Sequence, residues 1–308
     1  MEILTVKSNF DQLPLSVAIA TPKQPKAIVQ IVHGMCEHKE RYFAFMDYLV
    51  GAGFAVIIHD QRGHGQSVLS KDDLGYFYQD GATVMIEDTY QLTQLIKARF
   101  NDLPLFLMGH SMGSFVVRCY LDRYKHAIDG LLVCGSPSYN RLAKLGKLIC
   151  LLMQKIKGDH YRSQMIAKMS IGLYNRNFTI PNEWICSDSR IVNQFNQDEL
   201  CNFNFTVNGY YNLLDLMIRT YRKRLDGINS DLPVLFISGR QDPCIVNPES
   251  FIKAVNQFRH RGYLNVVSIL FDDMRHEILN ETNKEEVYTT IVNYLNRWTN
   301  DIGGKINE

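Results

Sequence analysis

The serine at position 111 is the first residue whose surroundings suggest chemistry. It lies in the stretch LFLMGHSMGSFVV, where one apolar run ends at Gly-His-Ser-Met-Gly and a second apolar run follows at once. We interpret the stretch as strand, sharp turn and helix. Gly109 and Gly113 are then required, because strand and helix approach so closely that side chains at these positions would collide. A surface Gly-Ser turn would have the same sequence, so the partners of Ser111 must decide between the two.

A serine hydroxyl needs a base to become a nucleophile, and the base needs a carboxylate that orients it. When the serine lies on such a turn, the acid and then the histidine follow it in the chain, each on a loop just after a strand. Asp242 follows the apolar run LPVLFISG, and His276 follows NVVSILFDD. The sequence therefore predicts a catalytic triad of Ser111, Asp242 and His276.

Other acids and histidines fit this pattern less well. Asp272 and Asp273 lie closer to a strand end, where they can cap a helix or face solvent. Asp231 precedes a strand and would lie at the opposite edge of the sheet. His260 falls at a helix terminus, where a surface histidine interacts with the helix dipole.

An acyl-transfer reaction also needs backbone N–H donors for the developing oxyanion. Met112 follows the serine at the N-terminus of the expected helix, and its amide is the first candidate. The second donor should come from the loop after an early strand, where IVQIVHGMCEH offers the amide of Met35. His33 and His38 in this loop could instead form a metal pair or be ordinary polar residues. Together with Cys36 they match no common zinc spacing, so we predict no metal site.

The elements that must position these residues alternate along the chain. EILTVKS and LPLSVAIA, separated by NFDQ, predict a β-hairpin at the edge of a larger sheet. After the hairpin, apolar runs alternate with amphipathic stretches such as residues 42–50 and 83–100; the runs are AIVQIVHG, FAVIIHD, LPLFLMGH and IDGLLVCGS. This alternation is typical of a parallel sheet covered on both faces by helices.

The alternation stops after Pro137 and resumes near residue 229. Residues 138–228 offer helical stretches and loops but no convincing core strand, whereas LPVLFISG, PESFIKAVNQF, NVVSILFDD and EEVYTTIVNYLNRW complete the earlier pattern. We therefore expect a core made of residues 1–137 and 229–308. Residues 138–228 form a helical insertion, which we call the cap.

Composition narrows the class of protein. The 308 residues are 46% hydrophobic, enough for a large core, and 33 Lys and Arg nearly balance 32 Asp and Glu. No strong field favours nucleic acid as a partner. The seven cysteines form no CxxC pair, which favours reduced structural thiols. With no basic-then-apolar leader and no apolar run of membrane-spanning length, we expect a cytoplasmic location.

Four motifs occur together in order: HGMCEHKERY, HDQRGHGQS, GHSMGS, and the pair SGRQD with RHEILNE. With these motifs the chain resembles α/β-hydrolases of the monoacylglycerol lipase and lysophospholipase group, which overlaps the serine aminopeptidase-like family S33. The resemblance implies a mostly parallel eight-stranded sheet flanked by helices, an inserted helical cap, the triad and oxyanion donors named above, and no cofactor. Asp60 and Arg62 are expected to build a structural loop near the pocket rather than to take part in catalysis.

The cap stretch KLGKLICLLMQKIK places apolar residues at helical spacing with lysines between them, among them Leu145, Leu148, Ile149 and Leu152. Such a face can contact an acyl chain, rest transiently on a membrane surface, or pack against the core. Our leading hypothesis is hydrolysis of carboxylic esters with medium or long acyl chains, of the monoacylglycerol or lysophospholipid type.

Two alternatives to this hypothesis use the same triad: a small-molecule carboxylesterase and an aminopeptidase-like serine hydrolase. A third is a binding protein on the same scaffold, which is disfavoured because every catalytic position holds a competent residue.

Overall fold

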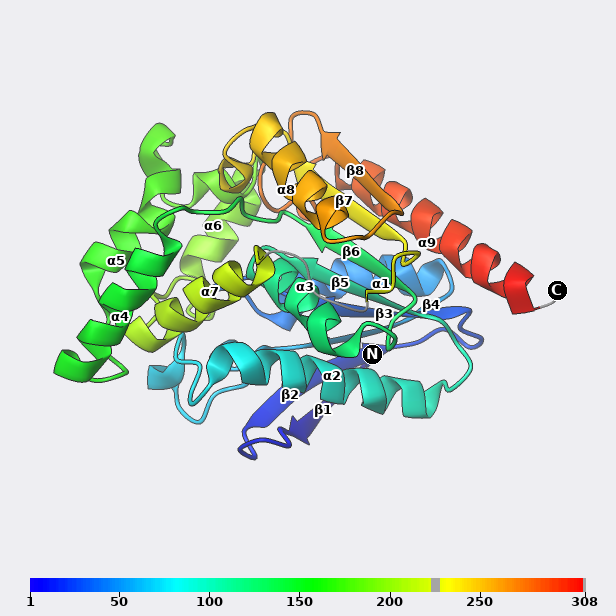
Figure 1. Ribbon diagram of the computed structural model, residues 1–308, viewed down its shortest axis with the longest axis horizontal. Coiled ribbons are helices and arrows are strands. Elements are labelled where there is room, and N and C mark those ends of the chain that lie inside the picture. The colour runs from blue at the N-terminus through cyan, green and yellow to red at the C-terminus, as the bar shows by residue number, and fades with distance from the viewer. Residues whose placement is uncertain (223–227, 307–308) are drawn as a thin grey trace.

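One eight-stranded sheet forms the centre of the molecule (Figure 1). The computed structural model describes residues 1–222 and 228–306. The strands are β1 (Glu2–Lys7), β2 (Pro14–Ala20), β3 (Ala27–Val32), β4 (Phe54–His59), β5 (Leu105–His110), β6 (Gly130–Cys134), β7 (Val234–Gly239) and β8 (Val266–Phe271). Across the sheet their order is β1-β2-β4-β3-β5-β6-β7-β8.

The predicted N-terminal hairpin is confirmed. β1 pairs antiparallel with β2, with Leu4 opposite Val17, and β2 pairs antiparallel with β4. Every other neighbouring pair of strands is parallel. The hairpin is therefore an antiparallel edge on an otherwise parallel sheet, and the carboxyl ends of the parallel strands all lie at one edge.

Helices cover both faces of the sheet (Figure 1). α1 (Phe43–Gly51) and α9 (Lys284–Ile306) pack on one face, and α2 (Gly81–Arg99), α3 (Met112–Tyr124) and α8 (Pro248–His260) pack on the other. In β3, Ile28 and Val32 belong to one core while Val29 and Ile31 belong to the other. This is why the strand reads as a continuous apolar run rather than as an alternating one.

The cap lies between β6 and β7 and consists of helices. Its α-helices are α4 (Ala143–Lys157), α5 (Gln164–Met169), α6 (Ser189–Gln197) and α7 (Val207–Thr220), with a 3-10 helix at Ile171–Asn177 and another at Glu183–Ile185. Residues 138–222, all of which are described, contain no strand. Residues 223–227, which we assigned to the cap, lie outside the described residues. The arrangement supports the proposed division into core and cap.

Small residues on α4 determine which side of this helix faces inward. α4 packs against α7, and α7 packs against α2 and α3 of the core. Ala143 and Cys150 are buried, and a Cβ added to Gly146 would meet the end of the Leu214 side chain. α7 is therefore the layer that covers the core, and α4 forms a second layer outside it.

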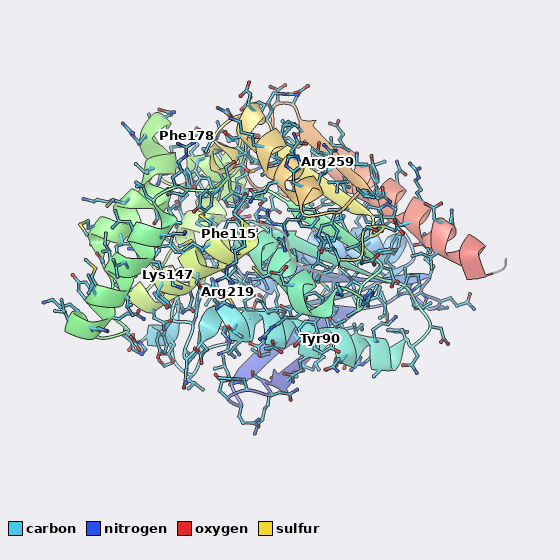
Figure 2. All side chains as sticks on the ribbon, in the orientation of Figure 1. Tyr90, Phe115, Lys147, Phe178, Arg219 and Arg259 are labelled. Carbon is cyan, nitrogen blue, oxygen red and sulfur yellow. The ribbon has the colours of Figure 1, made fainter. Side chains whose placement is uncertain are left out.

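An ion-pair cluster holds α4 on α7. Lys147 of α4 and Arg219 of α7 both pair with Asp215, at N···O distances of 2.5 Å and 2.6 Å, and both cations are labelled in Figure 2. Because all three charges lie at the contact between the two helices, they fix the rotation of α4. The opposite side of α4 is left toward solvent.

Candidate active site

Ser111 occupies a strained turn between β5 and α3. Its φ angle is +52°, which a residue with a side chain rarely adopts. A Cβ at Gly109 would lie 2.4 Å from the carbonyl oxygen of Gly113, and a Cβ at Gly113 would lie 2.1 Å from that of Val32. No side chain fits at such distances. The expected collision between the strand and the helix of the turn is confirmed for Gly109, whereas Gly113 is required because α3 also approaches the end of β3.

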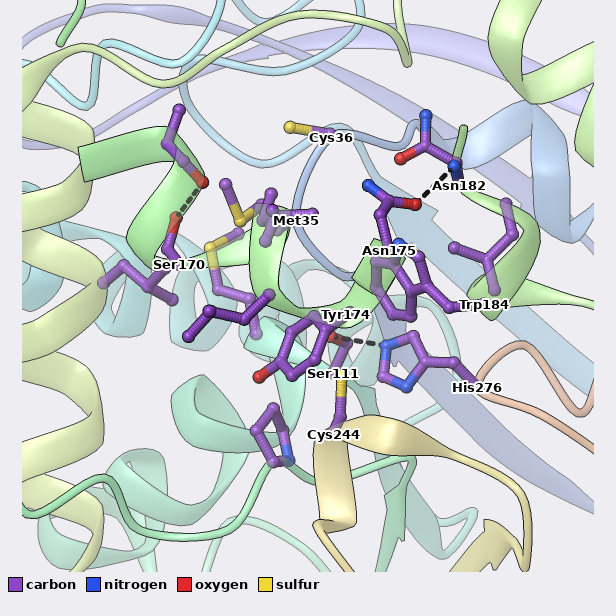
Figure 3. A pocket seen from close by; sticks show the side chains of 18 of the residues that line it. Met35, Cys36, Ser111, Ser170, Tyr174, Asn175, Asn182, Trp184, Cys244 and His276 are labelled. Carbon is purple, nitrogen blue, oxygen red and sulfur yellow. Dashed lines mark hydrogen bonds between the residues drawn. The ribbon is translucent and has the colours of Figure 1, made fainter. Parts of the chain in front are cut away.

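The three predicted triad residues lie together at the carboxyl edge of the sheet, and Figure 3 shows the hydrogen bond between Ser111 and His276. His276 Nε2 is 2.9 Å from Ser111 Oγ, and His276 Nδ1 is 2.9 Å from Asp242 Oδ2. Asp242 also accepts hydrogen bonds from Ser238 Oγ at 2.9 Å and from the amide of Cys244 at 2.8 Å. The carboxylate thus favours the Nδ1–H tautomer, which leaves Nε2 to accept the proton of the serine.

The rival residues lie at the surface. Asp272 pairs with Arg240 while both side chains are largely exposed. Asp273 accepts a hydrogen bond from the exposed Gln241 side chain. His260 is exposed in the last turn of α8. These groups do not reach Ser111, so the geometry favours Asp242 and His276.

Hydrogen bonds from His33 shape the loop that carries Met35. His33 Nδ1 donates to the carbonyl of Gly34 at 2.8 Å, and Nε2 accepts from the amide of Gln61 at 2.8 Å. Burial lowers the pKa of His33, which agrees with a neutral ring that donates on one side and accepts on the other. Met35 borders the same cavity as Ser111, and Met112 begins α3 directly after the serine. We keep both amides as the proposed oxyanion donors.

A buried pair that sequence reasoning missed lies behind this loop. Glu37 Oε1 accepts hydrogen bonds from Tyr42 Oη at 2.9 Å, from His110 Nδ1 at 3.0 Å and from the amide of Gly34. His110 Nε2 donates to the backbone carbonyl of His276 at 3.3 Å. The pair therefore connects the loop of the proposed oxyanion donor to the loop of His276, the predicted catalytic base.

The two members of this pair shift each other's pKa toward the charged forms. Burial alone disfavours either charge, but the neighbouring His110 holds the pKa of Glu37 well below its ordinary value. The charge of Glu37 in turn outweighs burial and raises the pKa of His110. Arg41 extends the cluster, with Nε 3.8 Å from Glu37 and an ion pair to Glu277, the neighbour of His276. His110 belongs to the serine pentapeptide, but no sequence signal names Glu37 as its partner.

The HDQRGHGQS stretch builds a structural loop. Asp60 accepts from the amide and the Nζ of Lys39, at 2.7 Å and 2.9 Å, and from the amide of Gln66 at 2.8 Å. Arg62 pairs with Asp88 at 2.9 Å. Neither Asp60 nor Arg62 borders the cavity above Ser111. These contacts agree with the expectation that the loop supports the site without acting in it.

A cavity of about 730 Å³ lies between Ser111 and the cap. This volume is within the range of small-molecule sites, roughly 300–1,000 Å³. Part of its wall is apolar and comes from α3, α7 and the Ile171–Asn177 helix: Phe115, Leu213, Leu214, Met217, Ile171 and Leu173. Asn175, Asn182 and Trp184 gather on one side of the Ser111–His276 hydrogen bond (Figure 3). The cavity therefore offers both apolar and polar surface beside the nucleophile.

Comparison with known proteins identifies the family. The family model for serine aminopeptidase, S33, matches residues 23–283. The chain belongs to the S33 family. A carboxyl esterase from Bacillus coagulans, solved in complex with glycerol, superposes with a TM-score of 0.88 at 26% identity and covers 97% of this chain and 98% of that one. The predicted α/β-hydrolase fold is confirmed.

Curated relatives of this S33 chain differ in length. A monoglyceride lipase homolog from Monkeypox virus is 25% identical over 89% of this chain and 89% of its own. An uncharacterized abhydrolase domain-containing protein from Dictyostelium discoideum is 28% identical over 92% of this chain, which spans only 28% of that longer protein. The resemblance to monoacylglycerol lipases and lysophospholipases is thereby confirmed.

The four cap residues expected to contact the acyl chain do not border the cavity. Leu145, Leu148 and Leu152 are 54%, 51% and 50% exposed, and Ile149 is half-buried. The reason is the packing of α4, whose small residues and Lys147 face α7. The prediction that these four residues contact the acyl chain is wrong. Residues of α7 border the cavity instead.

Two groups of potential metal ligands occur among the described residues. His38, Asp198 and Cys201 form one, and Asp242, Cys244 and His276 form the other, with ligand atoms within 4.8 Å of one another in each group. His38 already donates one ring N–H to Glu40 and the other to Asp198. In the second group Asp242 and His276, the predicted acid and base of the triad, hydrogen-bond each other. Hydrogen bonding accounts for both groups, and we assign no metal to either.

Proposed function

We propose that this S33 protein hydrolyses carboxylic esters with medium or long acyl chains through an acyl-enzyme on Ser111. One observation carries the proposal: the continuous hydrogen-bonded chain Ser111–His276–Asp242 opens into a large and partly apolar cavity. The names of relatives, monoglyceride lipase among them, agree with an ester hydrolase of this kind.

In the proposed mechanism His276 Nε2 takes the proton of Ser111 while Oγ attacks the ester carbonyl. The tetrahedral oxyanion accepts hydrogen bonds from the amides of Met35 and Met112. His276 then gives the proton to the leaving alcohol, and the acyl group remains on Ser111. His276 then deprotonates a water molecule that attacks the acyl-enzyme. As the bond from the acyl carbon to Ser111 Oγ breaks, His276 returns this proton to Oγ and the carboxylic acid is released, so the steps require no cofactor.

The cavity favours an ester substrate over a peptide with a free amino terminus. An aminopeptidase needs an unpaired carboxylate to bind the substrate ammonium. The acids that border the cavity are Glu37 and Glu277, and both are already paired, Glu37 with His110 and Glu277 with Arg41. Binding an ammonium group there would require breaking a buried ion pair, which is costly. The monoacylglycerol or lysophospholipid class therefore remains our proposal.

We further propose that the outer face of the cap touches a lipid surface during substrate uptake. The outer apolar face of α4 consists of exposed side chains at helical spacing: Leu142, Leu145, Leu148, Leu152 and Ile156. Exposed lysines flank it, among them Lys144, Lys155 and Lys157. Apolar side chains beside lysines suit the interface of an anionic bilayer.

Met169 and Leu173 are exposed and also border the cavity, so the cavity reaches the surface through the cap. Among the described residues no helix meets the length and hydropathy needed to cross a bilayer.

The test combines active-site labelling with a series of esters. We expect a fluorophosphonate to label Ser111, and Ser111→Ala to lose label and several orders of magnitude of turnover while its thermal unfolding stays unchanged. In the unmodified protein, kcat/KM should rise from acetyl to decanoyl esters, because each buried methylene contributes about 0.8 kcal/mol. Labelling of Ser111→Ala would refute the nucleophile. An acetyl preference would instead favour the small-molecule esterase.

A further inference from the structure

The indole N–H of Trp184 is a buried donor without a partner at the active site. Trp184 is only 8% exposed, and its Nε1 has no hydrogen-bond partner among the described residues. The side chain borders the cavity, and its ring centroid lies 5.1 Å from that of His276. A buried polar group left unpaired is unfavourable and calls for an explanation. An oxygen atom of a bound substrate would supply the missing acceptor.

The backbone places this donor rigidly relative to the catalytic base. Trp184 lies in the 3-10 helix Glu183–Ile185. The amide of Glu277 donates to the carbonyl of Ile185 at 2.7 Å, and Arg275 Nη1 donates to the carbonyl of Glu183 at 2.6 Å. The two residues on either side of His276 therefore hold the two residues on either side of Trp184. A donor held in this way needs little reorganisation when a substrate binds.

Neighbouring side chains give this part of the cavity further polar character. Asn182 precedes the Trp184 turn and donates its backbone N–H to Asn175 Oδ1 at 2.8 Å. This bond leaves the amide nitrogen of Asn175 without a hydrogen-bond partner among the described residues. In Figure 3 Asn175, Asn182 and Trp184 lie on the same side of Ser111 as His276. The apolar side chains of α7 line another part of the wall.

Because Trp184 lies beside His276, the geometry of the reaction indicates which part of an ester Trp184 can contact. In acyl transfer the base gives its proton to the oxygen of the leaving alcohol, so that oxygen must lie at His276 Nε2. Groups attached to the alcohol carbon then extend past the ring of His276, where Trp184 lies. We propose that Trp184 Nε1–H donates a hydrogen bond to a hydroxyl oxygen on the leaving alcohol, and so selects polyol esters over simple alkyl esters. The inference rests on the proposed ester hydrolysis and adds the recognition of the alcohol to it.

The experiment compares two decanoyl esters that differ only in the alcohol, 1-decanoylglycerol and ethyl decanoate, each kept below its aggregation concentration. For the unmodified protein we expect kcat/KM to be roughly tenfold higher for the glycerol ester, which corresponds to about 1.4 kcal/mol. In Trp184→Phe the ring remains but the N–H is lost, so most of this preference should disappear. Turnover of ethyl decanoate should stay within about twofold.

Trp298→Phe is the matched control. Trp298 is a buried tryptophan on α9, in the core on the other face of the sheet, so the same chemical change there should leave the ratio of the two kcat/KM values unaltered. Equal losses on both esters in Trp184→Phe would show that the ring acts only in packing, and equal kcat/KM for both esters in the unmodified protein would also overturn the proposal. The comparison of the two esters in the unmodified protein needs no variant, so it tests the proposal even where Trp184→Phe fails to fold. Hydrolysis of neither ester would refute the proposed function itself.

Discussion

The inner and outer sides of the cap differ in what their side chains contact. On the inner side, the Trp184 turn is held by the residues that flank His276, and Phe203 and Phe205 pack around the ring of His64. On the outer side, α4 and its N-cap residue Leu142 leave four leucines and an isoleucine exposed. The inner side therefore belongs to the architecture of the active site. The outer side carries apolar surface that the described core does not use, and this is the surface for which we propose contact with lipid.

The largest effect on activity is expected at Asp242, the predicted acid of the triad, in the active site that the inner side of the cap covers. Asp242→Asn should lower kcat by roughly ten thousand-fold, because the amide favours the wrong tautomer of His276. The fold should persist, since Ser238 and the amide of Cys244 can still hydrogen-bond the asparagine side chain. Steady-state kinetics with a soluble ester, beside thermal unfolding, measures both effects.

Asp273→Asn is the control for this substitution, because Asp273 lies at the surface near the end of β8 and accepts a hydrogen bond from the exposed Gln241. It should retain nearly full activity. A ten thousand-fold loss in Asp273→Asn, with Asp242→Asn active, would assign the acid to the other loop.

The second effect concerns the pH dependence of stability, which we expect to depend on the contact between the core and the inner side of the cap. Burial lowers the pKa of His64 to about 3, and that of His59 to about 3. Below pH 6.5 the unfolded chain binds protons at these rings that the folded protein does not, so stability must fall as the pH falls. Each ring contributes up to about 1.4 kcal/mol per pH unit to this loss.

His64→Phe provides the measurement for this effect. Phenylalanine fits among the surrounding rings of Phe77, Phe203 and Phe205 and does not titrate. Urea unfolding gives the free energy of unfolding at each pH. Between about pH 5.5 and pH 4, this free energy should change with pH by about 1.4 kcal/mol per unit less in His64→Phe than in the unmodified protein. Identical slopes would mean that His64 is protonated in the folded state or that the cap opens first.

The smallest effect is expected on the outer side. Leu148→Ser combined with Leu152→Ser should reduce binding to anionic vesicles several-fold, because two exposed apolar side chains are lost. Hydrolysis of monomeric esters of every chain length should stay within about twofold, since neither residue borders the cavity. Vesicle sedimentation and kinetics on soluble esters separate the two readouts.

Exposed leucines of the core provide the matched control. Leu69→Ser combined with Leu264→Ser removes leucines that are also exposed but do not belong to α4. Vesicle binding should be unchanged in this variant. Equal losses in both double variants would show that the outer face of α4 has no special role.

Much of the site could be predicted from local pattern and chain order. Ser111, Asp242 and His276 each follow an apolar strand, and parallel strands bring their carboxyl ends to one edge. The need for Gly109 followed from the turn alone, because β5 and α3, which would collide there, are adjacent in the sequence. At Gly113 the added Cβ would instead meet Val32 at the end of β3, which the turn by itself does not reveal. The cap could be recognised as a helical insertion for a similar reason, since the strand pattern stops and later resumes.

Pairs of distant residues could not be predicted in the same way. Glu37 and His110 lie far apart in the chain, and each favours the charged form of the other only because the fold brings them within hydrogen-bond distance. Trp184 is separated from His276 by α6, α7, β7, α8 and β8, so nothing local places an indole beside the ring of His276.

The sequence by itself determined the chemistry and the order of the elements: a serine on a glycine-flanked turn, an acid and a histidine after later strands, and an amphipathic helix in the cap. Only the tertiary structure decided which way that helix faces. Periodicity shows that α4 has an apolar stripe, but Ala143, Gly146 and Cys150 let α7 approach the other side, and Asp215 fixes the rotation through Lys147. A contact depends on both partners, and the second partner lies on a different helix.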